Sequence, residues 1–161
     1  MQYISVEHQR AISGRYKTAA IIVFAHCLTV LVIIVVARFV QPAEVAPGSE
    51  RLMRIAPAVV IVLALGVIVF RRVWISQVIF GSARKLGVNA VLNRLMQMTV
   101  VCAALSELVA IFGFVFYLLT RDYQYSLVLS VVSLLLLLYT AFPRRGEWER
   151  AVVASANAPA G

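Results

Sequence analysis

The chain has 161 residues, of which 62% are hydrophobic and only 14% charged, and its formal net charge is +8 at pH 7. The apolar share is higher, and the charged share lower, than in soluble globular domains, so a soluble fold could not bury this much apolar surface. A positive net charge can indicate nucleic-acid binding, but these basic residues are spread over several loops and form no single patch. We therefore expect the lipid bilayer, and no nucleic acid, as a partner.

Four long apolar runs follow one another along the chain: Ala19 to Ala37, Ile55 to Phe70, Met98 to Thr120 and Ser126 to Phe142. Each is close to the roughly 20 residues that an α-helix needs to cross about 30 Å of hydrocarbon. The sequence predicts an all-α integral membrane protein, a four-helix bundle forming one domain over 1–150, with helices at about 18–40, 54–80, 88–120 and 125–142. The small, featureless segment 151–161 is predicted to be a disordered tail.

The distribution of basic residues predicts the orientation of the helices. One side of the predicted topology holds both termini and the central loop, and it carries Arg10, Arg15, Lys17, Arg71, Arg72, Arg84, Lys85, Arg94, Arg144, Arg145 and Arg150. The opposite side carries only Arg38, Arg51, Arg54 and Arg121. The positive-inside rule therefore places both termini in the cytoplasm.

The helices are predicted to form two hairpins in series. A weak internal echo supports this arrangement, because Arg15 and Arg94 each open a basic-to-apolar transition and the closing helices end in Arg71-Arg72 and Arg144-Arg145. Duplication of one hairpin would explain the echo, and so would chance or a topology that the two halves share.

Small residues line one face of the third predicted helix, at alternating spacings of four and three: Thr99, Ala103, Ser106, Ala110 and Gly113. Lipid tails give helices no hydrophobic reason to associate, so close backbone approach and interhelical hydrogen bonds must hold them together. This face is predicted to pack against another helix. The neighbour is either within the same chain or in a second copy.

Glu107 is the only carboxylate within the four apolar runs, and it lies about 14 Å into the membrane from Met98 at 1.5 Å per residue. An ionised carboxylate at that depth is costly, so a protonated form or a hydrogen-bonding partner is expected. His26 on the first helix should lie at a similar depth if the first and third helices touch. Ser106, Ser130 and Ser133 approach the same level.

Two interpretations of this cluster compete. In the functional one, Glu107 binds or passes H⁺ or another cation, with His26 or a serine as its partner. In the structural one, the carboxylic acid is a hydrogen bond between helices, and His26 is a neutral histidine satisfied within an apolar face. Both interpretations stay open at the level of the sequence.

Motifs for other chemistry are missing from the sequence. There is no Walker loop, no paired Cys-x-x-Cys, no His-Glu-x-x-His and no Gly-x-Ser-x-Gly. The two histidines, His8 and His26, are too far apart in the predicted topology to share a metal or haem. We therefore predict no enzyme, no cofactor and no metal site.

The segment Ala103-Ala104-Leu105-Ser106-Glu107-Leu108-Val109-Ala110-Ile111-Phe112-Gly113 resembles the carboxylate helix of the rotary ATP synthase proteolipid, the c subunit. The resemblance covers about a dozen residues, and it implies that Glu107 is a proton-binding carboxylate. The chain departs from that family because the run Ala19 to Ala37 contains no glycine. Its termini are also predicted to lie in the cytoplasm, whereas proteolipids keep theirs on the outer side.

The second half, from Ala104-Leu105-Ser106-Glu107 through Gly113 to Pro143-Arg144, is similar to uncharacterised small bacterial membrane proteins with four helices. That resemblance implies a bacterial inner membrane and no particular activity. We expect an accessory or structural subunit, as a homo-oligomer or within a larger membrane complex. The alternative is proton or cation translocation through Glu107 in the manner of the proteolipid.

Overall fold

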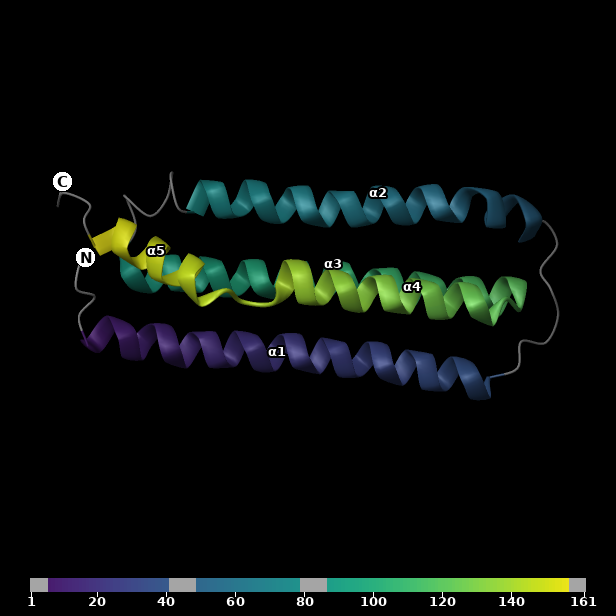
Figure 1. Cartoon of the computed structure of the whole chain (residues 1–161), viewed down its shortest axis with the longest axis horizontal. Helices are drawn as coiled ribbons and strands as arrows, with labels where there is room; N and C mark the ends of the chain where they lie inside the picture. Colours follow the sequence, from purple (N-terminus) through teal and green to yellow (C-terminus); the bar gives the residue numbers. More distant parts are fainter. Residues whose placement is uncertain (1–5, 41–48, 79–86, 157–161) are drawn as a thin grey trace.

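A computed structural model of the chain describes residues 6–40, 49–78 and 87–156, and these ranges are helical except for short connections (Figure 1). The order of elements is α1 (Val6–Phe39), α2 (Ser49–Ser76), α3 (Val88–Thr120), α4 (Tyr123–Leu136), the π-helical turn η2 (Leu137–Ala141) and α5 (Arg145–Ala156). The prediction of an all-α fold is confirmed for the described part of the chain.

Within the described ranges, four helical segments are long and apolar enough to cross a membrane: Val6–Phe39, Met53–Ser76, Val88–Thr120 and Tyr123–Ala156. Many of their large apolar side chains face outward, among them Phe24, Val62 and Leu135, which are 73%, 68% and 62% exposed. Apolar surface on this scale would be unfavourable in water and is favourable against lipid. The structure therefore supports the predicted multi-pass membrane bundle of four helices.

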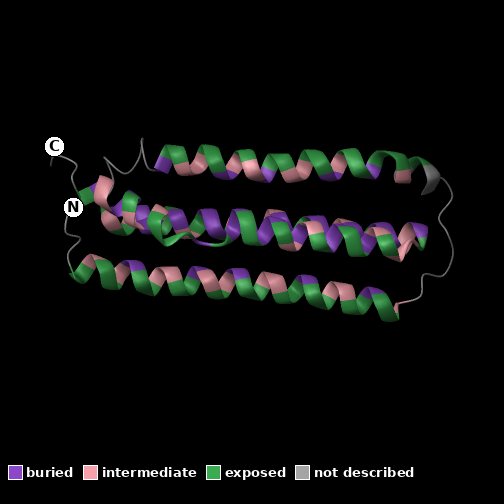
Figure 2. Ribbon diagram, in the orientation of Figure 1, coloured by how far each residue is buried: buried purple, intermediate pink, exposed green. Residues whose placement is uncertain are grey.

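The helices α3 and α4 form the centre of the bundle, and α1 and α2 flank them on opposite sides (Figure 1). Figure 2 shows that buried residues concentrate on α3 and α4, whereas α1 and α2 expose most of their surface. The expected second hairpin, α3 with α4, is closely packed. In the expected first hairpin, the described residues of α1 and α2 do not pack against each other, because each helix packs on α3 instead.

The flanking helices use narrow stripes to contact the centre. On α1 the buried side chains are Ile12, Ala19, Val23, Val30 and Ala37, which recur at spacings of seven and four and so lie on one face. One face is sufficient because the rest of the helix is directed away from the bundle. The small side chains among them allow the backbones to approach closely.

Two helices begin earlier than predicted. Helix α1 starts at Val6 and not near residue 18, since its first turns bury Ile12 while their polar side chains stay exposed. Helix α2 starts at Ser49 and not at 54. It begins with Ser and Glu, two residue types that favour the first turn of a helix. Its predicted end at residue 80 lies outside the described residues. Helix α3 has the predicted bounds of 88 and 120.

A tight turn joins α3 to α4. Arg121 adopts the left-handed conformation with φ of 62°, and its N–H donates to the Tyr117 carbonyl at 2.8 Å. The Asp122 carboxylate then caps α4 by accepting from the backbone N–H groups of Gln124 and Tyr125 at 3.0 and 3.3 Å. This capping fixes where α4 begins and holds it antiparallel to α3.

The prediction of a disordered tail is wrong for residues 151–156, because they belong to α5. Helix α4 ends in η2, where the Phe142 N–H donates to the Leu137 carbonyl, and Pro143 follows. The new helix packs back onto the bundle through Trp148, which is 1% exposed and meets the Tyr16 ring edge-on at 6.2 Å. Residues 157–161 of the predicted tail lie outside the described part of the chain.

An ion pair also connects α5 to the bundle. The Arg71 guanidinium near the end of α2 donates to the Glu147 carboxylate at 2.9 Å, and both side chains are largely buried. Helices α1 and α3 begin, and α2 ends, at this same end of the molecule (Figure 1). We call it the α5 end.

Candidate functional site

Glu107 and His26 are in contact across the interface of α1 and α3. The Nδ1 atom of His26 is hydrogen-bonded to Oε2 of Glu107, and the two side chains are 24% and 14% exposed. Ala103 and Ala110, one turn to either side of Glu107, are fully buried and let the two helices approach. Of the partners considered for Glu107, His26 is the one that the structure brings to it.

The charge of the His26–Glu107 pair depends on the number of protons it holds. A neutral histidine beside a carboxylic acid has no net charge, and an imidazolium beside a carboxylate has none either, and both forms contain the same number of protons. In either form a hydrogen bond between these side chains joins α1 to α3.

Of the three serines in the predicted cluster, Ser106 lies on α3 and contacts α4 and η2, whereas Ser130 and Ser133 lie on α4 itself. Ser133 donates to the Ser106 carbonyl at 2.7 Å, and the Ser106 hydroxyl donates to the Cys102 carbonyl at 2.8 Å. The Ser106 hydroxyl also lies 3.3 Å from that of Thr140. The Ser130 hydroxyl is buried and has no hydrogen-bond partner. The serine bonds thus join α3 to α4 and η2.

The small-residue face of α3 packs within the chain. Thr99, Ala103, Ser106, Ala110 and Gly113 are all buried. A Cβ atom on Gly113 would lie 2.7 Å from the Cβ of Leu129 on α4, a distance that real Cβ atoms do not reach. Glycine is therefore required for the observed contact between α3 and α4. Of the two neighbours left open by the sequence, the structure shows the one within the chain.

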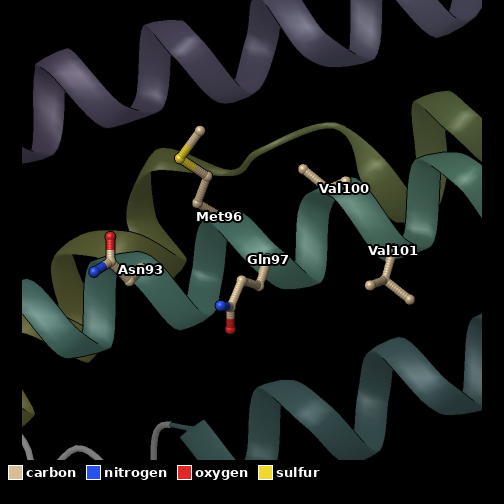
Figure 3. Close-up of a pocket in the computed structure, with 5 residues that line it drawn as sticks. All are labelled: Asn93, Met96, Gln97, Val100 and Val101. Carbon is tan, nitrogen blue, oxygen red and sulfur yellow. The ribbon is translucent and has the colours of Figure 1, made fainter.

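A groove runs along α3 on its remaining face, between α1 and α2 (Figure 3). Its first hollow, of about 310 Å³, is lined by Asn93, Met96, Gln97, Val100 and Val101. A second hollow of about 420 Å³ shares Val100 and Val101 and continues along Ala104, Leu105, Glu107, Leu108 and Ile111. Figure 3 shows Met96 directed toward α1 and Val101 toward α2. We call this continuous surface, from Asn93 to Ile111, the α3 groove.

A third hollow adjoins the α3 groove at the α5 end. It has a volume of about 290 Å³ and is lined by Trp74, Gln77, Val78, Arg94 and Gln97, so that Gln97 belongs to both hollows. The lining changes from amide and guanidinium groups at this end to aliphatic groups toward Ile111. Glu107 is the one ionisable side chain that lines the apolar part.

Sequence reasoning missed three features of the site region. The pairing of Arg71 with Glu147 has no signal in the sequence, since α5 itself was not predicted. Thr140 lies in η2, and no residue pattern distinguishes a π turn from the preceding helix. Helix α5, however, had a signal: Trp148, Ala151, Val152 and Ser155 have the spacing of one helical face and all four are buried.

The described residues contain no group of three or more His, Cys, Asp or Glu side chains that could hold a metal ion. Comparisons of the chain with protein-family models, with curated proteins and with solved structures found no match. The assignment of a function therefore depends on the chemistry of the residues described above.

Proposed function

We propose that this protein is a non-enzymatic accessory or structural subunit of a membrane assembly. The observation that carries the proposal is the bond between His26 and Glu107, because it uses the intramembrane carboxylate to join two helices of the same chain. The serines also form hydrogen bonds between helices. These polar side chains therefore have a role in holding the bundle together, and a catalytic set is missing from the sequence.

The proposed location is the bacterial inner membrane, with both termini in the cytoplasm. The described residues at the α5 end support this orientation, because basic side chains there outnumber acidic ones, which are Glu7, Glu147 and Glu149. Cytoplasmic ends of membrane helices carry such an excess of Lys and Arg. The proposed assembly is either a homo-oligomer or a complex with other membrane proteins.

Cross-linking in membranes, followed by purification in a mild detergent, tests the accessory role. We expect the chain to be recovered in a defined larger species, whose mass by light scattering identifies a homo-oligomer or a mixed complex. A Tyr139→Lys variant on the exposed face of η2 is expected to lower that recovery if this face is an interface. Recovery as a monomer without cross-linked partners would contradict the proposal.

Translocation of protons or cations through Glu107 is the second candidate function. Two observations favour it: the histidine bonded to Glu107 can accept a proton, and the α3 groove reaches Glu107 from the α5 end. The charge of the pair argues against it, since transfer would pass through a form with an uncompensated charge.

Glu107→Gln tests the second candidate, because the amide keeps the size of the side chain and removes its proton chemistry. Glu7→Gln, at an exposed position near the start of α1, is the matched control. We would measure proton and Na⁺ flux in proteoliposomes holding equal amounts of folded protein. Translocation requires that flux falls to the level of empty vesicles in Glu107→Gln alone. Equal flux in both variants and the wild type would exclude it.

A further inference from the structure

We propose that the α3 groove, together with the adjoining polar hollow, is a binding site for one anionic phospholipid. An acyl chain lies along the apolar part of the groove, and the headgroup lies at the α5 end. The proposal does not depend on the accessory role, and it assigns the α3 groove to a lipid instead of to the proton or cation path considered above.

The shape of the surface supports a lipid because three hollows are continuous along one line. The polar hollow shares Gln97 with the first part of the groove, and that part shares Val100 and Val101 with the second. From Val100 to Ile111, the part of the groove that is mainly aliphatic, the helix rises about 17 Å at 1.5 Å per residue, close to half of the roughly 30 Å hydrocarbon core. The aliphatic part of the groove therefore has about the length of one leaflet.

The lining changes along the groove in the same order as the parts of a phospholipid. At the α5 end it offers the Arg94 guanidinium, the amides of Asn93, Gln97 and Gln77, and the Trp74 ring. Cationic and amide groups with an indole are suited to an anionic headgroup at the membrane interface. Beyond Val100, the lining is aliphatic except for Glu107.

The form of the groove is compatible with an acyl chain. Its two hollows, of about 310 and about 420 Å³, share part of their lining and follow one face of α3. A narrow, flexible chain can lie along this face, and a partner helix is the alternative occupant that cross-linking detects. Water is a poor occupant because the lining offers it few hydrogen bonds.

The lack of packing between α1 and α2 explains why the groove exists. Each of these helices contacts α3, and their described residues do not contact each other, so a strip of α3 remains uncovered between them. Along this strip Ala104, Leu108 and Ile111 are exposed at helical spacing. The alanine at position 104 keeps the floor of the groove low at the point where a chain would pass.

Photochemical labelling in vesicles tests this proposal on the full chain. The protein is reconstituted into phosphatidylethanolamine vesicles with a trace of phosphatidylglycerol that carries a photoreactive group on one acyl chain. We expect labels on α3 between Asn93 and Ile111 to exceed those on the exposed face of α4 and η2, which includes Leu135 and Leu138. Unlabelled phosphatidylglycerol should compete for the α3 labels, and phosphatidylcholine should compete less.

Two pairs of variants locate the chain and the headgroup. Ala104→Phe raises the floor of the groove and should reduce the α3 labels to the level found on α4, whereas Ala25→Phe, on the exposed face of α1, should leave them unchanged. Arg94→Gln should weaken the preference for the anionic lipid about fivefold, the effect of one interfacial cation. Arg150→Gln on the exposed face of α5 is its control.

Several results would overturn the proposal. Equal labelling of all exposed helix faces would mean that only the general lipid shell is present, and competition that ignores the headgroup would mean the same. Cross-links from the groove to a second copy or another protein would assign it to a helix instead. The competition measurement uses the wild type, so the proposal can be tested even if Ala104→Phe does not fold.

Discussion

Replacing Gly113 with alanine tests whether the contact of α3 with α4 determines the stability of the bundle. The added Cβ would lie 2.7 Å from the Leu129 Cβ and 3.3 Å from its Cδ1. The Cβ belongs to the rigid part of α4, so a change of rotamer does not relieve the contact and the helices must separate. Overpacking of this kind costs about 1–3 kcal/mol, which offsets the gain of up to about 1 kcal/mol from alanine's higher helix propensity. We expect Gly113→Ala to lower the free energy of unfolding by about 1 kcal/mol.

Gly66→Ala is the matched control for this prediction. Gly66 lies on an exposed part of α2, and a Cβ there would meet no atom within 4 Å. Only the helix propensity changes, so the variant should be as stable as the wild type or more stable. The measurement is unfolding in mixed micelles of mild detergent and sodium dodecyl sulfate, followed by far-ultraviolet circular dichroism.

The geometry also predicts which second change can rescue the variant. Leu129→Ala keeps the Cβ that causes the closest contact, so it should not restore Gly113→Ala. Leu129→Gly removes that atom and should give a favourable coupling energy in a double-mutant cycle. If Gly113→Ala is as stable as Gly66→Ala, the observed packing of α3 on α4 is not the one that the protein uses, and the reasoning is wrong.

Three further predictions concern the polar contacts of the bundle. His26→Leu should destabilise the bundle by about 1–2 kcal/mol, because the Glu107 carboxyl is left without its partner. Adding Glu107→Leu to this variant should recover stability. Unfolding in mixed micelles measures both effects. Glu147→Gln should weaken the ion pair with Arg71 and accelerate hydrogen exchange in α5 more than in α3. Mass spectrometry measures this exchange, and an equal change in both helices would exclude this role for the ion pair. Tyr117→Phe removes a 2.6 Å hydrogen bond to the carbonyl just after α1 and should cost about 0.5–1.5 kcal/mol; unchanged unfolding would show that the bond is not formed.

The number of helices and their apolar character were predictable because the bilayer imposes a length on every span. The ends of the helices were less predictable. A search for continuous apolar runs stops where polar residues begin, but α1 continues with one buried side chain, Ile12, among polar ones. Helix α5 was not predicted for the same reason, since its buried residues are separated by charged ones such as Glu149 and Arg150.

The contact of His26 with Glu107 could be expected from depth, and the position of the serines could not. His26 and Glu107 lie at comparable distances from Arg15 and Arg94, the basic residues that precede the apolar parts of their helices, so they meet once α1 packs on α3. Ser106 precedes Glu107 by one residue and therefore lies about 100° away around the helix axis. That rotation directs it to α4, whereas depth alone placed both residues in one cluster.

The sequence of α3 does not reveal which of its faces contacts which neighbour, because all of its faces are largely apolar. One face holds Glu107 against α1, a second holds Ser106 and Gly113 against α4, and a third forms the floor of the α3 groove. In water, the exposed face of a helix would be polar and its orientation could be deduced from the periodicity. In a bilayer the exposed face must be apolar as well, so periodicity loses this information. The information that remains in the sequence is the position of small side chains and of rare polar groups. These positions located the packing face and the carboxylate. They did not locate the groove, because its lining of Val, Ala, Leu and Ile is the same as that of a surface covered by lipid.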